Sequence, residues 1–312
     1  MQAQDDMDRN SVDWRGYLPA ATTPFDRERN LDIPALGRLL EWLHAEGMHG
    51  LVIAGTTGEW FSLSPRERES LFRAAGTQLR GKLPLIGGCN AYTAREVIEL
   101  AQVARRYGFD GILVTPPPYV RPSEDEIFEF YRSINDAVGL PICVYNWPPG
   151  TNIDMSVGLL ERLSELERVV AVKNSTARLD RFLQGFFALK DRVRYFGFAM
   201  TPLGATLVRV HEGDGTMGAG AVLGRDQPDF YNHLWRGDIP SALNCGARDR
   251  LLTEEWFTES LTGRFGSAQA ILKEALNAQG LPGGYPRPPL QELTPSHRER
   301  VRDTLVRLGR IR

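Results

Sequence analysis

Lysine and cysteine are both scarce in this chain. Its 312 residues include 33 arginines but only four lysines, Lys82, Lys173, Lys190 and Lys273. The three cysteines are widely spaced and form no CxxC pair, so the sequence predicts neither a disulfide framework nor a zinc site. We therefore expect reduced thiols, a cytoplasmic location and no bound metal ion.

A large charge excess and a long apolar run are also missing. The 37 basic and 39 acidic residues leave a net charge of -2, which does not suit a protein that binds nucleic acid or an anionic membrane. No stretch approaches the roughly 18 apolar residues of a membrane span, and the N-terminal MQAQDDMDRN has no apolar segment. A small molecule or another protein is the expected partner.

What the sequence does contain is a regular alternation of short apolar runs and helical segments. This pattern is typical of a parallel sheet covered by helices, and eight such units predict a closed (β/α)₈ TIM barrel over residues 15–225. The predicted strands are residues 17–22, 50–55, 84–88, 111–115, 141–145, 169–172, 193–197 and 216–222.

Capping boxes support the predicted helices between these strands. Ser64, Thr93 and Ser123 are each followed three residues later by glutamate, as at the N-terminus of a helix. After the barrel, residues 226–312 are expected to form a helical region packed on it, with a small second domain as the alternative. Residues 1–14 are expected to be a mobile tail. The helices predicted in the C-terminal region are 228–236, 240–260, 265–279 and 295–308.

Lys173 directly follows the four apolar residues of the sixth predicted strand. In a TIM barrel the loops after the strands form the catalytic face, so Lys173 should lie at the barrel mouth. A lysine with a pKa of about 10.4 is protonated at neutral pH, but a dry environment lowers that pKa and favours attack on a carbonyl. Position alone fits equally well a lysine that extends to solvent. The remaining lysines lie in turns or polar helical stretches.

Tyr145 ends the fifth strand and should therefore lie beside Lys173. It could act as a general acid and base, with Thr56 or Thr57 relaying the proton, or it could simply be a packing tyrosine. The turn that begins at Gly55, GTTGE, could present backbone N–H groups to a carboxylate, although such a turn often has no binding role.

Other catalytic signatures are missing or misplaced. The chain contains no HExxH zinc motif, no GxSxG nucleophile elbow and no P-loop. GDGTMG at 213–218 fits the GxGxxG pattern of dinucleotide-binding loops, but it falls at the eighth strand instead of after the first. We therefore expect no cofactor.

Three motifs together resemble the dihydrodipicolinate synthase and N-acetylneuraminate lyase family. They are AGTTGEWFSLSPRER (54–68), YNWPPGTN (145–152) and VVAVKNS (169–175), and the resemblance extends over about residues 15–225. It implies a TIM barrel, usually a homotetramer built from tight dimers, that condenses or cleaves 2-oxo acids through a lysine imine without metal or organic cofactor.

The resemblance also implies roles for individual residues. Lys173 matches the lysine that forms the Schiff base, and Tyr145 matches the tyrosine that moves the proton. Thr56 matches the hydroxyl that relays this proton, and Thr57 matches the threonine that holds the carboxylate of the 2-oxo acid.

Two further positions match the family pattern. Tyr119 matches a tyrosine that family members lend across the dimer to the neighbouring site, although the run TPPPY is one residue longer than the usual form. Met217 matches a position whose backbone carbonyl lines the site.

Several residues depart from the synthase pattern. Gly150 stands where synthases have an arginine that binds the carboxylate of the second substrate, and Phe198 and Ala199 stand where they have an acidic pair. Trp60 and Trp147 are expected to add aromatic area at the mouth, unless they fill the core or a subunit interface. Such a pocket should prefer a different, less polar acceptor.

The sequence therefore predicts a Schiff-base lyase that joins pyruvate, or a substituted 2-oxo acid, to an aldehyde or cleaves such a product, and that is not an authentic dihydrodipicolinate synthase. A dehydratase of deoxy-oxo sugar acids is the alternative, because GEWFSL (58–63) is similar to a stretch in those enzymes. A second alternative is a non-catalytic barrel that binds a 2-oxo acid.

Overall fold

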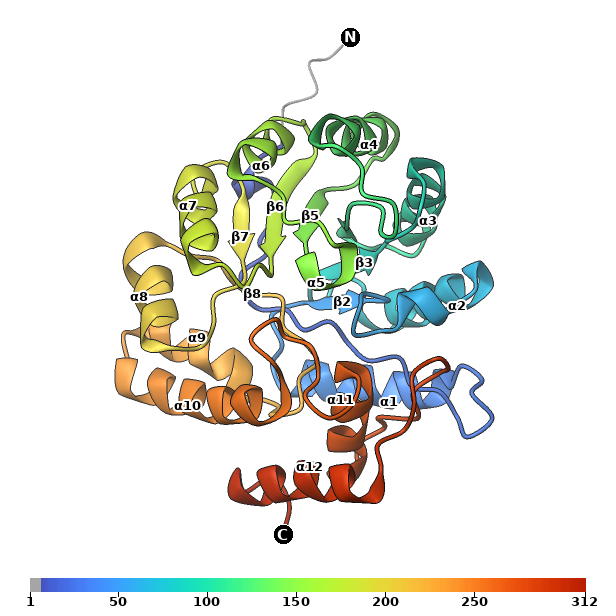
Figure 1. Cartoon of the computed structure of the whole chain (residues 1–312), viewed down its shortest axis with the longest axis vertical. Coiled ribbons are helices and arrows are strands. Elements are labelled where there is room, and N and C mark those ends of the chain that lie inside the picture. The colour runs from blue at the N-terminus through green and yellow to red at the C-terminus, as the bar shows by residue number, and fades with distance from the viewer. Residues whose placement is uncertain (1–6) are drawn as a thin grey trace.

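The computed structural model of the chain describes residues 7–312, and its centre is an eight-stranded parallel sheet (Figure 1). The strands follow the order β1-β8-β7-β6-β5-β4-β3-β2. A parallel bridge between Ala20, just after β1, and Val52 of β2 closes the ring, which confirms the predicted (β/α)₈ TIM barrel. The strands are β1 (Gly16–Tyr17), β2 (Leu51–Ile53), β3 (Leu85–Gly88), β4 (Gly111–Val114), β5 (Ile142–Asn146), β6 (Val169–Asn174), β7 (Arg194–Phe196) and β8 (Gly215–Thr216).

The first and eighth strands are much shorter than the predicted 17–22 and 216–222. Pro19 has no N–H to donate to a ladder, so the regular pairing of the first strand is interrupted at this residue. The two segments nevertheless stay together beyond the strands, because Ala20 also bridges to Ala219.

Helices surround this sheet between the strands, as the sequence predicts. All three predicted capping boxes are present, at Ser64, Thr93 and Ser123. In each, the hydroxyl accepts an N–H three residues on and the glutamate there accepts the cap residue's N–H. The elements are η1 (Arg9–Ser11), α1 (Ile33–Ala45), η2 (Trp60–Ser62), α2 (Pro65–Leu79), α3 (Ala94–Arg106), α4 (Glu124–Ala137), α5 (Pro148–Thr151), α6 (Val157–Ser164), α7 (Leu179–Leu189) and α8 (Pro202–His211).

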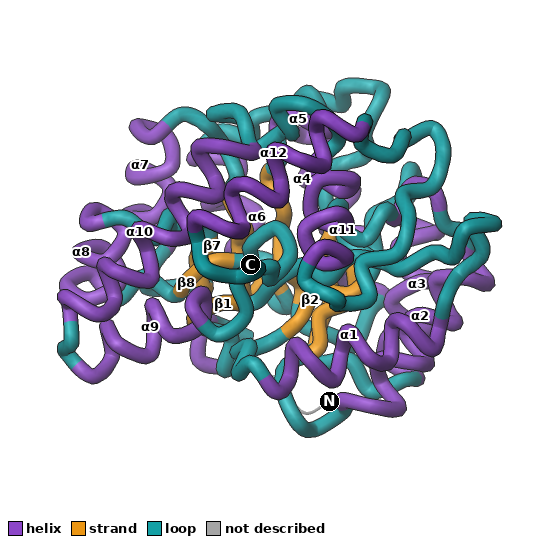
Figure 2. The backbone as a smooth tube through the Cα atoms, turned by 90° about the horizontal axis from the view of Figure 1, so that it is seen from below, coloured by secondary structure: helices purple, strands orange, loops and turns teal. Residues whose placement is uncertain are grey.

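Four further helices pack on one side of the barrel. Figure 2 shows α11 and α12 in front of the strands when the molecule is seen from below. Trp256 and Ile271 of this region belong to the same apolar cluster as Leu36 of α1, so barrel and C-terminal helices share a core. None of the helices within residues 7–312 is both long and apolar enough to cross a membrane. The four are α9 (Asp226–Arg236), α10 (Ile239–Trp256), α11 (Ala268–Ala278) and α12 (Pro295–Arg307).

The described part of the predicted tail is packed against the barrel. The Met7 N–H donates to Glu167 O at 2.9 Å, and the Arg9 N–H donates to Arg192 O at the same distance. Trp14 is only 1% exposed and joins the cluster that fills the barrel interior. The predicted mobile tail therefore differs from the structure over residues 7–14, and its first six residues lie outside the described part.

A β-bulge in β6 decides which way its last residues point. Val169 and Ala171 pair with consecutive residues of β5, which leaves Val170 as the extra residue. Val170 and Ala171 both belong to the interior cluster. Alternation then resumes, so Val172 packs with the surrounding helices and Lys173 points into the barrel.

Candidate active site

A cavity of about 470 Å³ lies at the carboxyl ends of the barrel strands. It is bounded by strand ends, by α9 and α10, and by the segment between α10 and α11. Its lining includes Thr56, Thr57, Tyr145, Trp147, Lys173, Ser175, Phe198, Met217, Gln227, Asp249, Leu252, Thr253, Phe257 and Gln269.

Lys173 is a buried amine at the end of β6. Its residue is 7% exposed, and burial lowers the pKa of its ammonium to about 8. No carboxylate is paired with it among residues 7–312. Cys143, on the interior face of β5, adds no stabilising negative charge, because burial raises the pKa of its thiol to about 12. A substantial fraction of Lys173 is therefore neutral near pH 8, as nucleophilic attack requires.

Tyr145 lies directly beside this amine. It is paired with Lys173 in the β5–β6 register, and the lysine Nζ lies 4.1 Å from the centre of the tyrosine ring. Burial raises the pKa of the phenol above its usual value, while the nearby Ser175 and Thr56 hydroxyls act in the opposite direction. The phenol thus remains protonated at neutral pH and can donate a proton.

The hydroxyl of Thr56 is available for a relay. It is buried without a direct hydrogen-bond partner among the described residues, although it lies close enough to Tyr145 to affect the phenol's pKa. Ser175 was missed in the sequence, although it lies only two residues after Lys173. Thr57 is 8% exposed and also lines the cavity.

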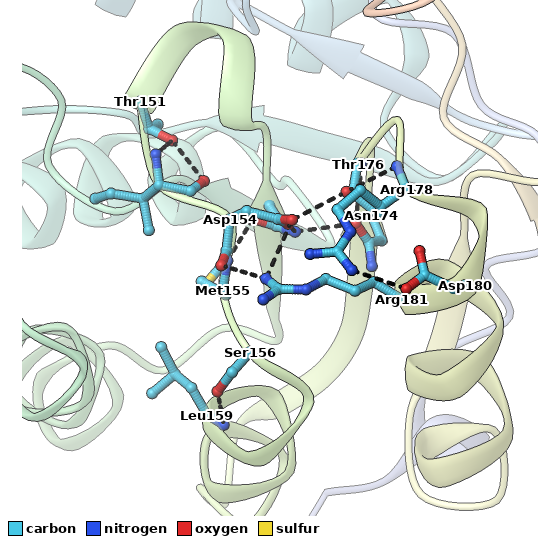
Figure 3. Close-up of polar contacts among 12 residues, drawn as sticks. Thr151, Asp154, Met155, Ser156, Leu159, Asn174, Thr176, Arg178, Asp180 and Arg181 are labelled. Carbon is cyan, nitrogen blue, oxygen red and sulfur yellow. Dashed lines mark hydrogen bonds and ion pairs between the residues drawn. The ribbon is translucent and has the colours of Figure 1, made fainter.

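Asn146 and Asn174, which directly follow Tyr145 and Lys173, hold the ends of β5 and β6 together. Asn146 donates to Asn174 Oδ1 at 3.0 Å and to Asp154 Oδ1 at 2.9 Å. Asp154 also accepts hydrogen bonds from Thr176 at 3.2 Å and from Arg181 at 3.2 Å (Figure 3). This network holds the ends of β5 and β6 together beside the cavity.

The loop that carries Thr56 and Thr57 is held by α11. Gln269 donates from Nε2 to Thr56 O at 3.0 Å. One turn further along α11, Lys273 forms an ion pair with Glu59, and both side chains are at most 1% exposed. The interpretation of Lys273 as part of a polar stretch is therefore wrong, because a helix from the C-terminal region carries it into the core.

Lys273 nevertheless differs from Lys173 in its surroundings. Its ammonium also donates to Tyr285 O at 2.8 Å, and Glu59 accepts the Arg287 N–H at 3.0 Å. Burial lowers the pKa of Lys273 to about 8, against the opposing effect of Glu59. Because it is paired and does not line the cavity of Lys173, it holds the loop instead of reacting.

Three other predicted site residues also line the cavity. Met217 has its sulfur 3.9 Å from the Cys143 sulfur, and Trp147 is stacked on Tyr145 with ring centres 6.2 Å apart. Phe198 contributes differently, because its ring packs against Phe182 of α7 at 5.2 Å and is buried. Its side chain thus mainly fills the core, as the packing alternative predicts.

The remaining predicted residues do not line this cavity. Gly55 is buried, and Trp60 packs against Tyr92 with ring centres 6.3 Å apart. Gly150 lies in α5, where an added Cβ would come within 1.9 Å of the Trp147 ring. Tyr119 is 93% exposed. No group of three or more His, Cys, Asp or Glu side chains in residues 7–312 is placed to hold a metal ion.

We predict that Lys273→Met destabilises the protein by about 3–5 kcal/mol, because it leaves the Glu59 carboxylate buried and unpaired. Urea unfolding measures this loss. The double variant Lys273→Met/Glu59→Gln should recover part of it. Lys190→Met, which breaks an exposed pair with Asp191, is the matched control and should leave the unfolding midpoint nearly unchanged. Equal midpoints for Lys273→Met and the control would contradict the role of the buried pair.

Comparison with known proteins agrees with the geometry. The sequence profile of the dihydrodipicolinate synthetase family matches residues 13–308. A 4-hydroxy-tetrahydrodipicolinate synthase of Methylobacterium radiotolerans is 35% identical over 298 residues, covering 95% of this chain and 96% of that protein. A protein of the same name from Phenylobacterium zucineum is 38% identical over 241 residues, covering 77% of this chain and 80% of that protein.

Solved structures give the same result. Dihydrodipicolinate synthase from Aquifex aeolicus has a TM-score of 0.84 and 27% identity, covering 95% of this chain and 98% of its own. The chloride-inhibited dihydrodipicolinate synthase from Acinetobacter baumannii, solved in complex with pyruvate, has a TM-score of 0.84 and 26% identity, covering 95% and 99%. The chain therefore belongs to the dihydrodipicolinate synthetase family and is an enzyme of the lyase class, a pyruvate-dependent aldolase.

Proposed function

We propose that this enzyme joins pyruvate to an uncharged aldehyde, or cleaves the corresponding 4-hydroxy-2-oxo acid, through an imine on Lys173. The observation that carries the proposal is the juxtaposition of a buried, unpaired amine with a protonated phenol, 4.1 Å from nitrogen to ring centre, in one cavity. A non-catalytic barrel would have no need to keep this amine dry.

The reaction follows from these two groups. Neutral Lys173 attacks C2 of pyruvate, and loss of water gives the protonated imine. Tyr145 protonates the hydroxyl that leaves as water, and its phenolate then takes a proton from C3, which gives the enamine and restores the phenol. The enamine C3 attacks the aldehyde carbon. Tyr145 donates its proton to the aldehyde oxygen as the C–C bond forms, and Thr56 can return a proton to the phenol. Water finally hydrolyses the imine and frees Lys173.

The carboxylate of pyruvate is best placed against the loop of Thr57. Thr57 lines the cavity, and its hydroxyl and the backbone N–H groups of this loop are the hydrogen-bond donors that we assign to the anion. Gln269 Nε2 donates to Thr56 O at 3.0 Å, which keeps this carbonyl oxygen away from the pyruvate carboxylate. Met217, just after β8, adds an apolar side chain to the cavity lining.

The acceptor site argues for an aldehyde without a carboxylate. The names of the relatives favour the synthase reaction, whose product carries a second carboxylate. Here, however, Gly150 replaces the arginine that would bind that group, and the Trp147 ring fills the space next to it. Because this wall has the indole of Trp147 instead of an arginine side chain, it favours an acceptor aldehyde without a charge.

We predict that the wild-type enzyme releases pyruvate from 4-hydroxy-2-oxo acids with uncharged tails and condenses pyruvate with aspartate semialdehyde only slowly. Coupled assay of pyruvate measures both reactions. Tyr145→Phe should lower kcat by about 10²–10⁴-fold, because it removes the proton donor. Lys173→Arg keeps the positive charge but cannot form an imine, so it should abolish turnover.

Two outcomes would contradict this assignment. Fast condensation with aspartate semialdehyde would identify the enzyme as a synthase of the same reaction as its named relatives. Loss of water from deoxy-oxo sugar acids without release of pyruvate would make it a dehydratase that uses the same imine.

We further propose that Tyr119 completes the site of a neighbouring subunit within a homotetramer built from dimers. Tyr119 is 93% exposed and lies next to Val120, which is 69% exposed, so this loop has no cover within its own chain. A tyrosine in that position is better explained by a second copy than by solvent.

Co-expression of two inactive variants tests the exchange of Tyr119. If the tyrosine crosses the dimer, Lys173→Arg mixed with Tyr119→Phe should regain about a quarter of wild-type activity, since half of the dimers are mixed and each has one intact site. Lys173→Arg mixed with Tyr145→Phe is the control. It should stay inactive, because both residues belong to the same subunit's site. Absence of recovery in the first mixture would contradict the proposal.

A further inference from the structure

A carboxylate from the C-terminal region enters the wall of the catalytic cavity. Asp249 lies in the middle of α10, far along the chain from the barrel strands, and lines the same cavity as Lys173. The sequence patterns give no reason to single it out, since α10 is otherwise a mixed polar helix on the side of the barrel (Figure 1).

A chain of hydrogen bonds orients one oxygen of this carboxylate. Gln227 of α9 donates one N–H to Asp249 Oδ1 at 2.9 Å and the other to the Tyr17 hydroxyl at 2.8 Å. Tyr17 in turn donates to Gly220 O at 2.5 Å, and Gln227 Oε1 accepts the Leu223 N–H at 3.4 Å. Every donor in this chain is used, so the direction of each hydrogen bond is fixed.

The other oxygen of Asp249 has no protein partner. Among residues 7–312, neither a hydrogen bond nor an ion pair reaches its Oδ2. The adjacent arginines are engaged elsewhere, since Arg248 binds Asp226 at 2.7 Å and Arg250 faces Glu254 at 3.6 Å. Asp249 lines the cavity, and its Oδ2 is not among the buried side-chain atoms that lack a partner, so this oxygen has accessible surface. A carboxylate acceptor without a partner in a binding cavity needs a donor from the ligand.

We propose that Asp249, held by Gln227, is a specificity-determining residue that accepts a hydrogen bond from a hydroxyl group on the acceptor aldehyde. This inference rests on the proposed function and narrows its substrate class to uncharged hydroxyaldehydes. The group touches the acceptor and takes no part in the imine chemistry at Lys173.

The charge of Asp249 and the apolar side chains around it favour a hydroxyl group as its ligand over a carboxylate or an ammonium. Burial raises the pKa of Asp249 to about 6, so the group is still mostly ionised at pH 7.5 and repels an acceptor carboxylate. An ammonium would be desolvated among the apolar side chains of Leu252 and Phe257, which line the same wall. A hydroxyl costs less to bury and supplies the one donor that the free oxygen lacks. Thr253, one turn along α10, also lines this wall, but its hydroxyl donates to the backbone carbonyl of Asp249 at 2.9 Å, so its proton is already used.

Acceptor selectivity tests this inference. In condensation with pyruvate, the wild-type enzyme should prefer glyceraldehyde and erythrose over propanal and butanal in kcat/KM. Asp249→Asn keeps the shape and the Gln227 hydrogen bond but removes the charge. It should lower kcat/KM for the hydroxyaldehydes about ten-fold or more, leave propanal nearly unchanged and improve use of succinic semialdehyde.

The matched control is Asp238→Asn, which makes the same charge change at the exposed N-terminus of α10 and keeps the cap. It should leave the selectivity unaltered.

Borohydride trapping of the pyruvate imine should be equal in wild type and Asp249→Asn, which separates this inference from the proposed function. Absence of trapping in the wild type would overturn the function itself. Normal trapping with an unchanged ratio of hydroxyaldehyde to alkyl aldehyde in Asp249→Asn, or a wild-type preference for 3-aminopropanal over 3-hydroxypropanal, would overturn the role of Asp249.

Discussion

The exclusion of water around Lys173 is the constraint on which the site depends. An ammonium at the end of a barrel strand loses hydration, and no carboxylate among residues 7–312 forms an ion pair with it, so the neutral amine becomes accessible near pH 8. The same burial acts in the opposite sense on Tyr145, whose phenol keeps its proton. Burial at one cavity thus provides a neutral amine as nucleophile and a protonated phenol as acid, side by side. No group of side chains among the described residues is placed to hold a metal ion.

The C-terminal helices make this arrangement possible. Through Gln269 and Lys273, α11 holds the loop that carries the two threonines, and through Asp249, α10 forms part of the cavity wall. The barrel alone would leave Glu59 as an unpaired buried acid. The helical region is therefore part of the active site as well as of the core, which explains why one apolar cluster extends through both.

Much of the barrel and the central pair could be predicted from the sequence. Strand ends are visible as apolar runs followed by polar residues, and neighbouring strands of a barrel bring such ends together, which is enough to place Tyr145 beside Lys173. The direction in which the Lys173 side chain points was harder to predict from the sequence. Strict alternation from Val169, which packs outward, would turn Lys173 outward too, and only the bulge at Val170 turns it inward.

Contacts between distant segments could not be predicted in this way. Lys273 stands in a stretch whose composition is typical of a surface helix, and its burial depends on Glu59, 214 residues earlier in the chain. Gln269 contacts Thr56 across 213 residues. Periodicity within a helix reports its apolar face, but it does not report which loop a polar side chain on that face will meet.

Trapping of the pyruvate imine at a series of pH values tests the central claim most directly. With only four lysines, peptide mapping after reduction with cyanoborohydride identifies the labelled residue without ambiguity. We expect the label to be confined to Lys173. The initial rate of labelling should rise with pH to half of its maximum near pH 8, because attack requires the neutral amine. Labelling of another lysine, or a half-maximum near the value of about 10.4 for a free lysine, would contradict it.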